Sequence, residues 1–254
     1  MVTFRPVPGI DLVVETAPGT PDVIRWFSDR IAEEAASIRA RKGRPPLIAL
    51  SGGSTPGPIY EWLARDHADL VRNAFWCQTD ERDVPPDHPD SNQGLIRRTL
   101  FQAKPGDEIP TFLAVPLPAS DPRVAAQRYA GQLTSHLDRT GADSIDLLLL
   151  GIGNDGHTAS LFPDADWRCP DDAPPAPPFR AIHVPHLGGF RYTLTLPTLI
   201  AAFRRLFLAR GESKSSIIYK AIHDEKGVFP AGVVGRQAST LWLLDEAAAA
   251  NIHR

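Results

Sequence analysis

Residues 145–163 read IDLLLLGIGNDGHTASLFP, a short apolar run that breaks into a glycine-rich turn. The run from Ile145 to Leu150 is typical of a strand buried on both faces of a parallel sheet. The glycines let the backbone turn sharply and approach a ligand closely. Asp155 and His157 then place a carboxylate beside a proton-transfer group. Because open α/β sheets bind ligands at the carboxyl ends of their strands, the turn predicts a functional site. The alternative is an ordinary glycine-rich loop with a capping aspartate.

Helical and strand patterns alternate along the rest of the chain. The expected strands are 47–50, 74–79, 112–115, 145–150, 192–196, 205–209 and 240–244, and the expected helices are 20–41, 57–65, 91–101 and 122–137. This alternation predicts an α/β fold, a doubly wound Rossmann-like domain with a mostly parallel central sheet flanked by helices. No repeat or long linker divides the 254 residues, so we expect a single domain over 1–254. The proline-rich stretch 170–178 is interpreted as a surface loop.

Composition argues against several classes of protein. A net charge of −3 gives no basic footprint for nucleic acid. No apolar run approaches the ~20 residues of a membrane span. The amino end, residues 1–22, lacks the layout of a secretion signal, which favours a cytoplasmic protein. Cys77 and Cys169 lie too far apart in sequence for a metal-ligand motif, and we expect no metal or other cofactor.

A second polar loop, Ser51-Gly52-Gly53-Ser54-Thr55, follows the expected strand at 47–50. Its glycines free backbone N–H groups to point inward, its hydroxyls add donors, and the next helix offers its positive end. These features suit a phosphate cradle, although the spacing matches neither a P-loop nor a dinucleotide fingerprint. The alternative is a capped turn, with Thr55 as N-cap and Pro56 at the first helical position.

Charged residues follow the strand expected at 74–79, where the chain reads Asp80-Glu81-Arg82-Asp83. In a functional interpretation, Asp80 faces the pocket to hold sugar hydroxyls or move a proton, while Arg82 binds an anion. In the alternative, the acids repel one another on a solvated surface. Dense charge directly after an apolar strand favours the functional interpretation.

Two further cations lie near expected strands. Lys214, in Gly211-Glu-Ser-Lys214, enters a helix first turn, which is unfavourable unless an anion is also there. It therefore suits a phosphate held by the loop at 51–55, and a solvated lysine is the alternative. Arg191, just before the strand expected at 192–196, can supply a second cation, although a surface role is the simpler interpretation.

Together these segments resemble the 6-phosphogluconolactonases of the glucosamine-6-phosphate isomerase/6-phosphogluconolactonase superfamily. The resemblance is carried in order by 50–56, 79–82, 90–92, 151–163, 191–195 and 211–214. It implies hydrolysis of 6-phospho-D-glucono-1,5-lactone to 6-phospho-D-gluconate, the second step of the oxidative pentose phosphate pathway. The expected partner is a small sugar phosphate, with no nucleic acid or membrane, and the expected state is a monomer or weak homodimer.

The resemblance also suggests roles for individual residues. His157 is expected to activate water, Asp155 to orient the imidazole or the sugar, and Asp80 to hold a hydroxyl. The expected contacts to substrate and phosphate are Ser51, Gly52, Gly53, Ser54, Thr55, Asn92 and Lys214, together with Arg82 or Arg191. Backbone N–H groups of the glycine turn are candidates for binding the oxyanion.

Two other functions remain open at this point. Deaminating isomerases of the superfamily continue their Asp-Gly-His core with Ala-Phe-Asn-Glu-Pro, whereas here the glutamate slot is Phe162. They also usually carry tyrosine or tryptophan where this chain has Arg82. The same fold serves as a sugar-phosphate sensor in some transcription regulators, but residues 1–46 contain no basic recognition element.

Overall fold

The apolar runs of the sequence form the central sheet of a computed structural model, which describes residues 2–4, 12–17, 22–103, 109, 111–168 and 176–252. The strands of this sheet are β1 (Val2–Phe4), β2 (Leu12–Ala17), β3 (Leu47–Leu50), β4 (Phe75–Gln78), β6 (Leu147–Leu150), β9 (Arg204–Ala209) and β10 (Thr240–Asp245). Their order is β1-β2-β10-β9-β6-β3-β4. All neighbours run parallel except β1, which is antiparallel to β2. The mostly parallel sheet confirms the predicted α/β class.

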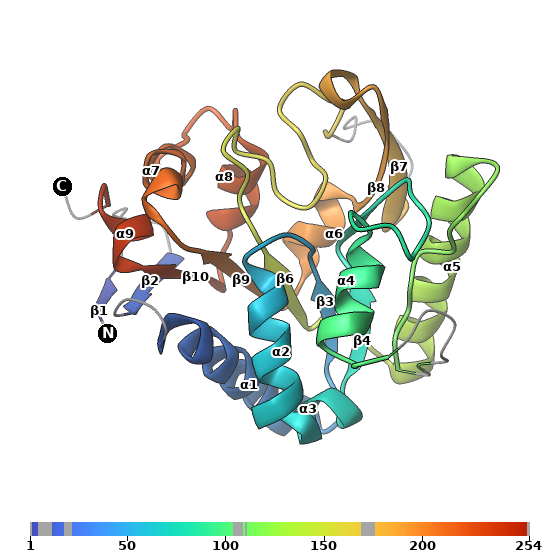
Figure 1. Cartoon of the computed structure of the whole chain (residues 1–254), viewed down its shortest axis with the longest axis horizontal. Helices are drawn as coiled ribbons and strands as arrows, with labels where there is room; N and C mark the ends of the chain where they lie inside the picture. The colour runs from blue at the N-terminus through green and yellow to red at the C-terminus, as the bar shows by residue number, and fades with distance from the viewer. Residues whose placement is uncertain are drawn as a thin grey trace.

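Helices cover both faces of this sheet (Figure 1). They are α1 (Asp22–Lys42), α2 (Pro56–Asp66), α3 (Ala68–Asn73), α4 (Asn92–Thr99), α5 (Pro122–Thr140), α6 (Leu196–Ala201), α7 (Ser215–Ile222), α8 (Pro230–Gly235) and α9 (Glu246–Ala249), with 3-10 turns η1 (Pro185–Leu187) and η2 (Glu212–Lys214). One apolar cluster joins the sheet to α1 and α2, and a second joins it to α5, α7 and α8. The fold is therefore a three-layer sandwich.

Strand β6 shows why its leucine run is continuous. Leu147 and Leu149 pack toward α1 and α2, while Leu148 and Leu150 belong to the cluster on the opposite face. Successive side chains of a strand point to opposite faces, so a strand covered on both sides needs apolar residues at every position. Each buried leucine contributes about 1.5–3 kcal/mol relative to an exposed one.

A second, smaller sheet lies beside the carboxyl end of β4. It consists of β5 (Asp80–Arg82), β7 (Phe179–Val184) and β8 (Gly189–Leu194), antiparallel and in the order β5-β8-β7. The sequence pattern indicates a loop at 80–82 and a strand at 192–196. Both assignments are corrected here, because 80–82 pair with β8, and β8 begins at Gly189.

The strand predicted at 112–115 is not a regular strand. Only Phe112 forms a parallel bridge, to Trp76 of the edge strand β4. Farther along, the N–H of Val115 donates to the side-chain Oε1 of Gln78 over 2.8 Å, which replaces a ladder bond. Strands β1, β2 and β7 were not predicted. The expected helix start at Thr20 and most of the expected proline-rich loop, residues 170–175, lie outside the described residues.

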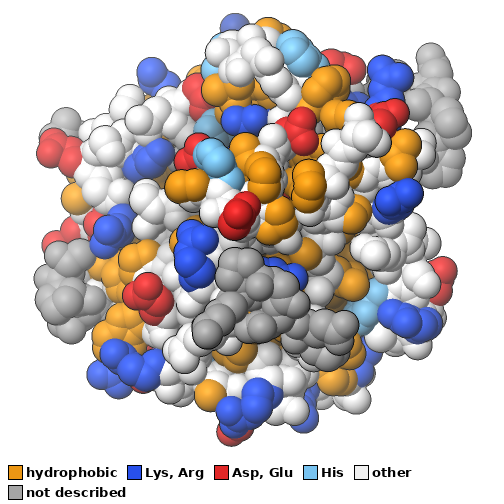
Figure 2. Space-filling view, turned by 45° about the vertical axis from the view of Figure 1, so that its right-hand side comes forward, with side chains coloured by type: hydrophobic (Ala, Val, Ile, Leu, Met, Phe, Trp, Pro, Cys, Tyr) orange, Lys and Arg blue, Asp and Glu red, His pale blue; other side chains and the backbone are white. Residues whose placement is uncertain are grey.

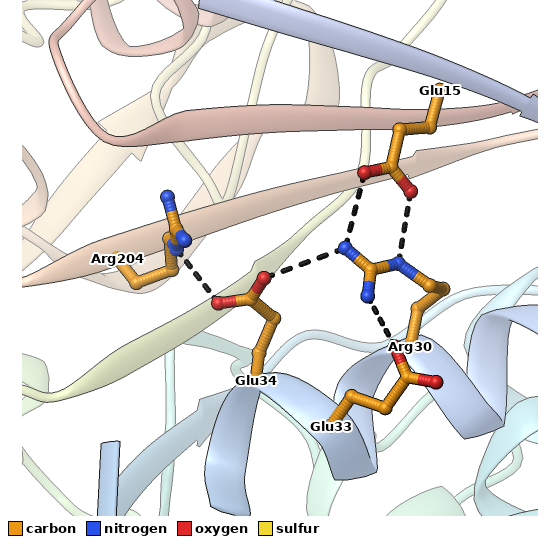
Figure 3. A network of polar contacts seen from close by, with 5 residues as sticks. All are labelled: Glu15, Arg30, Glu33, Glu34 and Arg204. Carbon is orange, nitrogen blue, oxygen red and sulfur yellow. Dashed lines mark hydrogen bonds and ion pairs between the residues drawn. The ribbon is translucent and has the colours of Figure 1, made fainter. Parts of the chain in front are cut away.

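A polar network anchors α1 to the sheet (Figure 3). Arg30 of α1 bonds both carboxylate oxygens of Glu15 on β2, at 2.8 and 3.1 Å, and also contacts Glu33 and Glu34. Glu34 in turn accepts from Arg204 at the start of β9 over 2.8 Å. The network therefore connects one helix to two strands that are separated by β10.

The surface mixes charges of both signs. On the face shown in Figure 2, basic side chains are scattered among acidic and apolar ones instead of forming one broad basic area. Among the described residues, none of the helices combines the length and apolar character that crossing a membrane requires.

Candidate active site

The carboxyl ends of β3, β4, β6 and β9 meet at one edge of the sheet, because these strands run parallel. A cavity of about 230 Å³ opens there. The predicted site residues that line it are Ser51, Gly52, Gly53, Ser54, Thr55, Asp80, Arg82, Asn92, His157 and Lys214. A second cavity of about 410 Å³ is lined by Asp155 and Arg191, and shares Asp80, Arg82 and His157 with the first. The structure therefore brings together all the loops that the sequence singled out.

Asp155 and His157 form a hydrogen-bonded pair. His157 Nδ1 lies 2.6 Å from Asp155 Oδ1, and the His157 backbone N–H donates to the same oxygen over 3.2 Å. Burial raises the pKa of Asp155, but the hydrogen bond and charge of His157 outweigh it and lower that pKa to about 2. An ionised partner at Nδ1 favours the tautomer that carries its proton there. We therefore assign Nε2 as the nitrogen that is free to accept a proton.

Glycine is required at two positions around this pair. A Cβ on Gly153 would lie 2.1 Å from His157 Nδ1, so any larger residue would displace the imidazole. Gly156 has φ +87°, and a Cβ there would lie 2.4 Å from Phe229 Cδ1. L-residues with side chains rarely adopt such a backbone. The glycine spacing of the sequence thus reflects the packing of the turn against His157 and Phe229.

The loop at 51–55 keeps its polar groups available. Thr55 has helical dihedral angles, φ −75° and ψ −45°, and its side chain caps none of the described backbone N–H groups. Thr55 therefore occupies the predicted N-cap position with Pro56 as the first helical residue, but without a side-chain hydrogen bond to the described part of the helix. A Cβ on Gly52 would lie 1.7 Å from Asn92 Oδ1, an atom buried without a hydrogen-bond partner among the described residues. The loop therefore presents donors to the cavity, while Asn92 Oδ1 is enclosed beside Gly52.

Lys214 ends the turn η2 and directly precedes α7. Its ammonium donates to the carbonyl of Ile152 over 2.8 Å, which ties it to the loop that carries His157. Burial lowers the pKa of Lys214, while the charge of Asp155 acts in the opposite direction. The half-buried lysine faces the same cavity as the loop at 51–55, so the solvated alternative does not describe it.

Asp80 is buried, at 6% exposure, so the interpretation of a solvated acidic cluster is wrong for this residue. Its Oδ1 accepts from Thr79 Oγ1 and its Oδ2 from Ser160 Oγ, both over 2.8 Å. Neither Thr79 nor Ser160 is predicted as a site residue from the sequence. Ser160 lies in the long motif at 151–163, which could have marked it as a site residue. Its partner Asp80 is distant in sequence, so the contact itself could not be predicted.

Glu81 is fully buried and organises the neighbouring wall. It accepts hydrogen bonds from the backbone N–H groups of Asn92 and Gln93, over 2.7 and 2.6 Å, at the start of α4. The side chain of Gln78 donates to it as well, over 2.8 Å. Asn92 then donates from Nδ2 to the carbonyl of Asp80 over 2.9 Å. Glu81 thereby positions Asn92, a role that the sequence analysis missed.

Arg82 and Arg191 lie directly opposite each other on β5 and β8. Arg191 is inside β8 and not before it, which corrects the predicted position. Burial lowers the pKa of Arg191, and the charge of Arg82 lowers it further. Both arginines line the second cavity, and Arg82 also lines the first.

The doubly wound sheet thus carries a polar glycine loop and an aspartate–histidine pair at its carboxyl edge, and comparison with known families assigns this arrangement to a class. The model of the family described as glucosamine-6-phosphate isomerases/6-phosphogluconolactonase matches residues 20–242. The chain therefore belongs to this family.

Several relatives of this chain carry the name of one of the two enzymes in the family description. A 6-phosphogluconolactonase of Synechocystis is 37% identical over 213 residues, covering 81% of this chain and 84% of the relative. The 6-phosphogluconolactonase of Nostoc is 34% identical and covers 94% and 98% of the two chains. Among solved structures, 6-phosphogluconolactonase from Trypanosoma cruzi has a TM-score of 0.75 at 26% identity, covering 94% of this chain and 96% of that one.

Proposed function

We propose that this chain hydrolyses 6-phospho-D-glucono-1,5-lactone to 6-phospho-D-gluconate, a step of the oxidative pentose phosphate pathway. The observation that carries the proposal is the 2.6 Å contact between Asp155 and His157 beside a cavity that also holds the loop at 51–55 and Lys214. The names of the relatives in several organisms support the same substrate. Hydrolysis of the freshly generated lactone above its spontaneous background tests the proposal.

Binding begins with the phosphate. In the proposed complex, backbone N–H groups and hydroxyls of residues 51–55 and the amino end of α2 surround it, and Lys214 neutralises it. The phosphate takes no part in the reaction, so its binding energy serves to fix the lactone carbonyl beside His157. Asp80 and Asn92 line the same cavity, and in the proposed complex they contact the sugar hydroxyls between the phosphate and C1.

The chemical step uses His157 twice. Neutral Nε2 removes a proton from water as the water oxygen attacks C1, and a tetrahedral intermediate forms. The bond between C1 and the ring oxygen then breaks, and the imidazolium returns the proton to that oxygen. Asp155 stays ionised and stabilises the imidazolium, which agrees with its low pKa.

Deamination of an amino-sugar phosphate fits the site less well. At the slot where deaminases place a glutamate, Phe162 packs its ring against His157, with centroids 4.3 Å apart. An aromatic ring cannot complete the proton relay that isomerisation between C1 and C2 requires. A monomeric glucosamine-6-phosphate deaminase shares the fold, with a TM-score of 0.72, at 20% identity.

Replacing Lys214 with alanine is expected to raise KM for the phosphorylated lactone about 10- to 100-fold, because one charge-assisted contact is lost. The value of kcat should change less, since the lysine contacts a group remote from the reaction. Steady-state kinetics with glucono-1,5-lactone, which lacks the phosphate, should show no such increase. Lys220→Ala, on the exposed side of α7, is the matched control. An unchanged KM in Lys214→Ala would remove the lysine from the phosphate site.

The pH profile should report His157 and not Asp155. Because the pKa of Asp155 is about 2, the carboxylate remains charged throughout the range where imidazoles titrate. Loss of kcat/KM in acid should therefore follow one ionisation, the protonation of the base. In Asp155→Asn the imidazolium loses its counter-charge, so this acidic limb should move to lower pH and kcat should fall.

The control for that experiment is Asp29→Asn, which disrupts another aspartate–histidine pair, Asp29 and His67 at 2.9 Å, neither of which lines the two cavities. It should leave the acidic limb in place. An acidic limb that stays in place in Asp155→Asn as well would contradict the proposed pairing.

The proposal includes a cytoplasmic enzyme that acts on a small sugar phosphate as a monomer or weak homodimer. Sedimentation at several protein concentrations tests the oligomeric state, and a tight larger oligomer would overturn that part.

A further inference from the structure

Two cationic centres face the candidate site from different walls. Lys214 and the loop at 51–55 line the first cavity, whereas Arg191 lines the second. Arg82 and His157 line both. The imidazole of His157 therefore faces both the cavity that contains Lys214 and the cavity that contains Arg191.

The two arginines have donors to spare. Arg82 donates to the carbonyl of Asp90, and Arg191 donates to the carbonyl of Phe190 over 2.9 Å. No ion pair joins either guanidinium to a carboxylate within the described part of the chain. A guanidinium carries five N–H donors, so most of them remain for a ligand.

Their placement concentrates like charge, which the carboxylates of Asp80, Asp83 and Asp90 offset only from outside the pair. Arg82 and Arg191 are register partners on antiparallel strands, and like charges directly opposite each other destabilise a sheet. An anion held between the two would remove this repulsion. The same face of the small sheet carries Asp80 and Thr193, which bond Ser160 of the loop behind His157. These bonds hold the strands that carry the arginines against the loop that carries His157.

Resting on the proposed function, the chemistry supplies a second anion. The product has a phosphate at C6 and a carboxylate at C1, at opposite ends of a six-carbon chain. We propose that Arg82 and Arg191 bind the C1 carbonyl oxygen as it becomes an oxyanion and then bind the product carboxylate. The loop at 51–55 and Lys214 hold the phosphate. This assigns the arginines to the reacting end instead of to the phosphate, where the sequence analysis expected one of them.

The arginine pair suits this role chemically. The planar fork of a guanidinium matches the two oxygens of a carboxylate, and donors placed where negative charge develops lower the barrier of acyl transfer. In the reaction, water adds to C1, the ring bond to C1 breaks, and His157 carries the proton to the ring oxygen. The carboxyl proton is released to solvent, and the arginines stabilise charge without exchanging protons.

Calorimetric binding of two ligands separates the ends of the site. 6-Phospho-D-gluconate carries a phosphate and a carboxylate, while D-glucitol 6-phosphate carries the phosphate and a hydroxymethyl group at C1. Arg191→Ala should weaken binding of the first about 10- to 100-fold and leave the second unchanged. Lys214→Ala should weaken both. Arg180→Ala, on the same small sheet but lining neither cavity, should change neither.

Equal weakening of both ligands in Arg191→Ala, or no weakening of either, would overturn the inference. Failure of the wild-type chain to bind either ligand would instead overturn the proposed function. If Arg191→Ala does not fold, Arg191→Lys keeps the charge without the fork. The Arg191→Lys variant should then lose less affinity than the roughly 10- to 100-fold expected for Arg191→Ala, and only for 6-phospho-D-gluconate.

Discussion

His157→Ala is expected to lower kcat for lactone hydrolysis about 10²- to 10⁴-fold, the usual contribution of a positioned general base. The substrate should still bind, because the phosphate contacts belong to other loops. Phe162, whose ring packs on the imidazole, carries no group that could replace the base. Stopped-flow measurement of acid release from the fresh lactone, corrected for spontaneous opening, checks the effect.

The matched control is His67→Ala. His67 also pairs with an aspartate, Asp29 at 2.9 Å, but lies at the far end of α2 from the loop at 51–55. The kcat of the His67→Ala variant should equal that of the wild type. Full activity in His157→Ala would show that another group activates the water.

Glu81→Ala is expected to lower the free energy of unfolding by about 3 kcal/mol or more, because several buried donors lose their acceptor and each costs ~1–3 kcal/mol. The donors are the N–H groups of Asn92 and Gln93 and the amide of Gln78. Activity should fall as well, since α4 positions Asn92 in the cavity wall. Urea unfolding measures the change in stability.

Glu33→Ala provides the comparison. Glu33 forms an ion pair with Arg30, but its side chain is 63% exposed. Exposed ion pairs contribute ~0–1 kcal/mol, so this variant should unfold almost as the wild type does. A loss in Glu81→Ala no larger than the loss in Glu33→Ala would show that the buried carboxylate does not hold α4.

The sequence predicted the features that depend on local pattern. The leucine run of β6 and the apolar face of α1 are periodic, and the structure confirms both elements. The polar segments that follow β3, β4, β6 and β9 are visible in the sequence, and they meet at one edge because parallel strands end on the same side. The chemical roles of the site residues stay predictions.

Features that depend on distant partners were not predicted. The small sheet joins residues 80–82 to residues 189–194, and no local pattern signals such a pairing. In the sequence Glu81 is one acid in a charged run, and its buried position depends on hydrogen bonds from α4, which no local pattern indicates. At 112–115 the apolar residues suggested a strand, but the side chain of Gln78 occupies the position of a ladder partner.

One measurement tests the central claim most directly: the rate of 6-phospho-D-glucono-1,5-lactone opening with and without the wild-type chain. The lactone is generated immediately before mixing, and the spontaneous rate is subtracted. We predict a large acceleration that saturates with substrate and is lost in His157→Ala. A rate equal to the spontaneous background, in a folded preparation, would contradict the assignment of this chain as a lactonase.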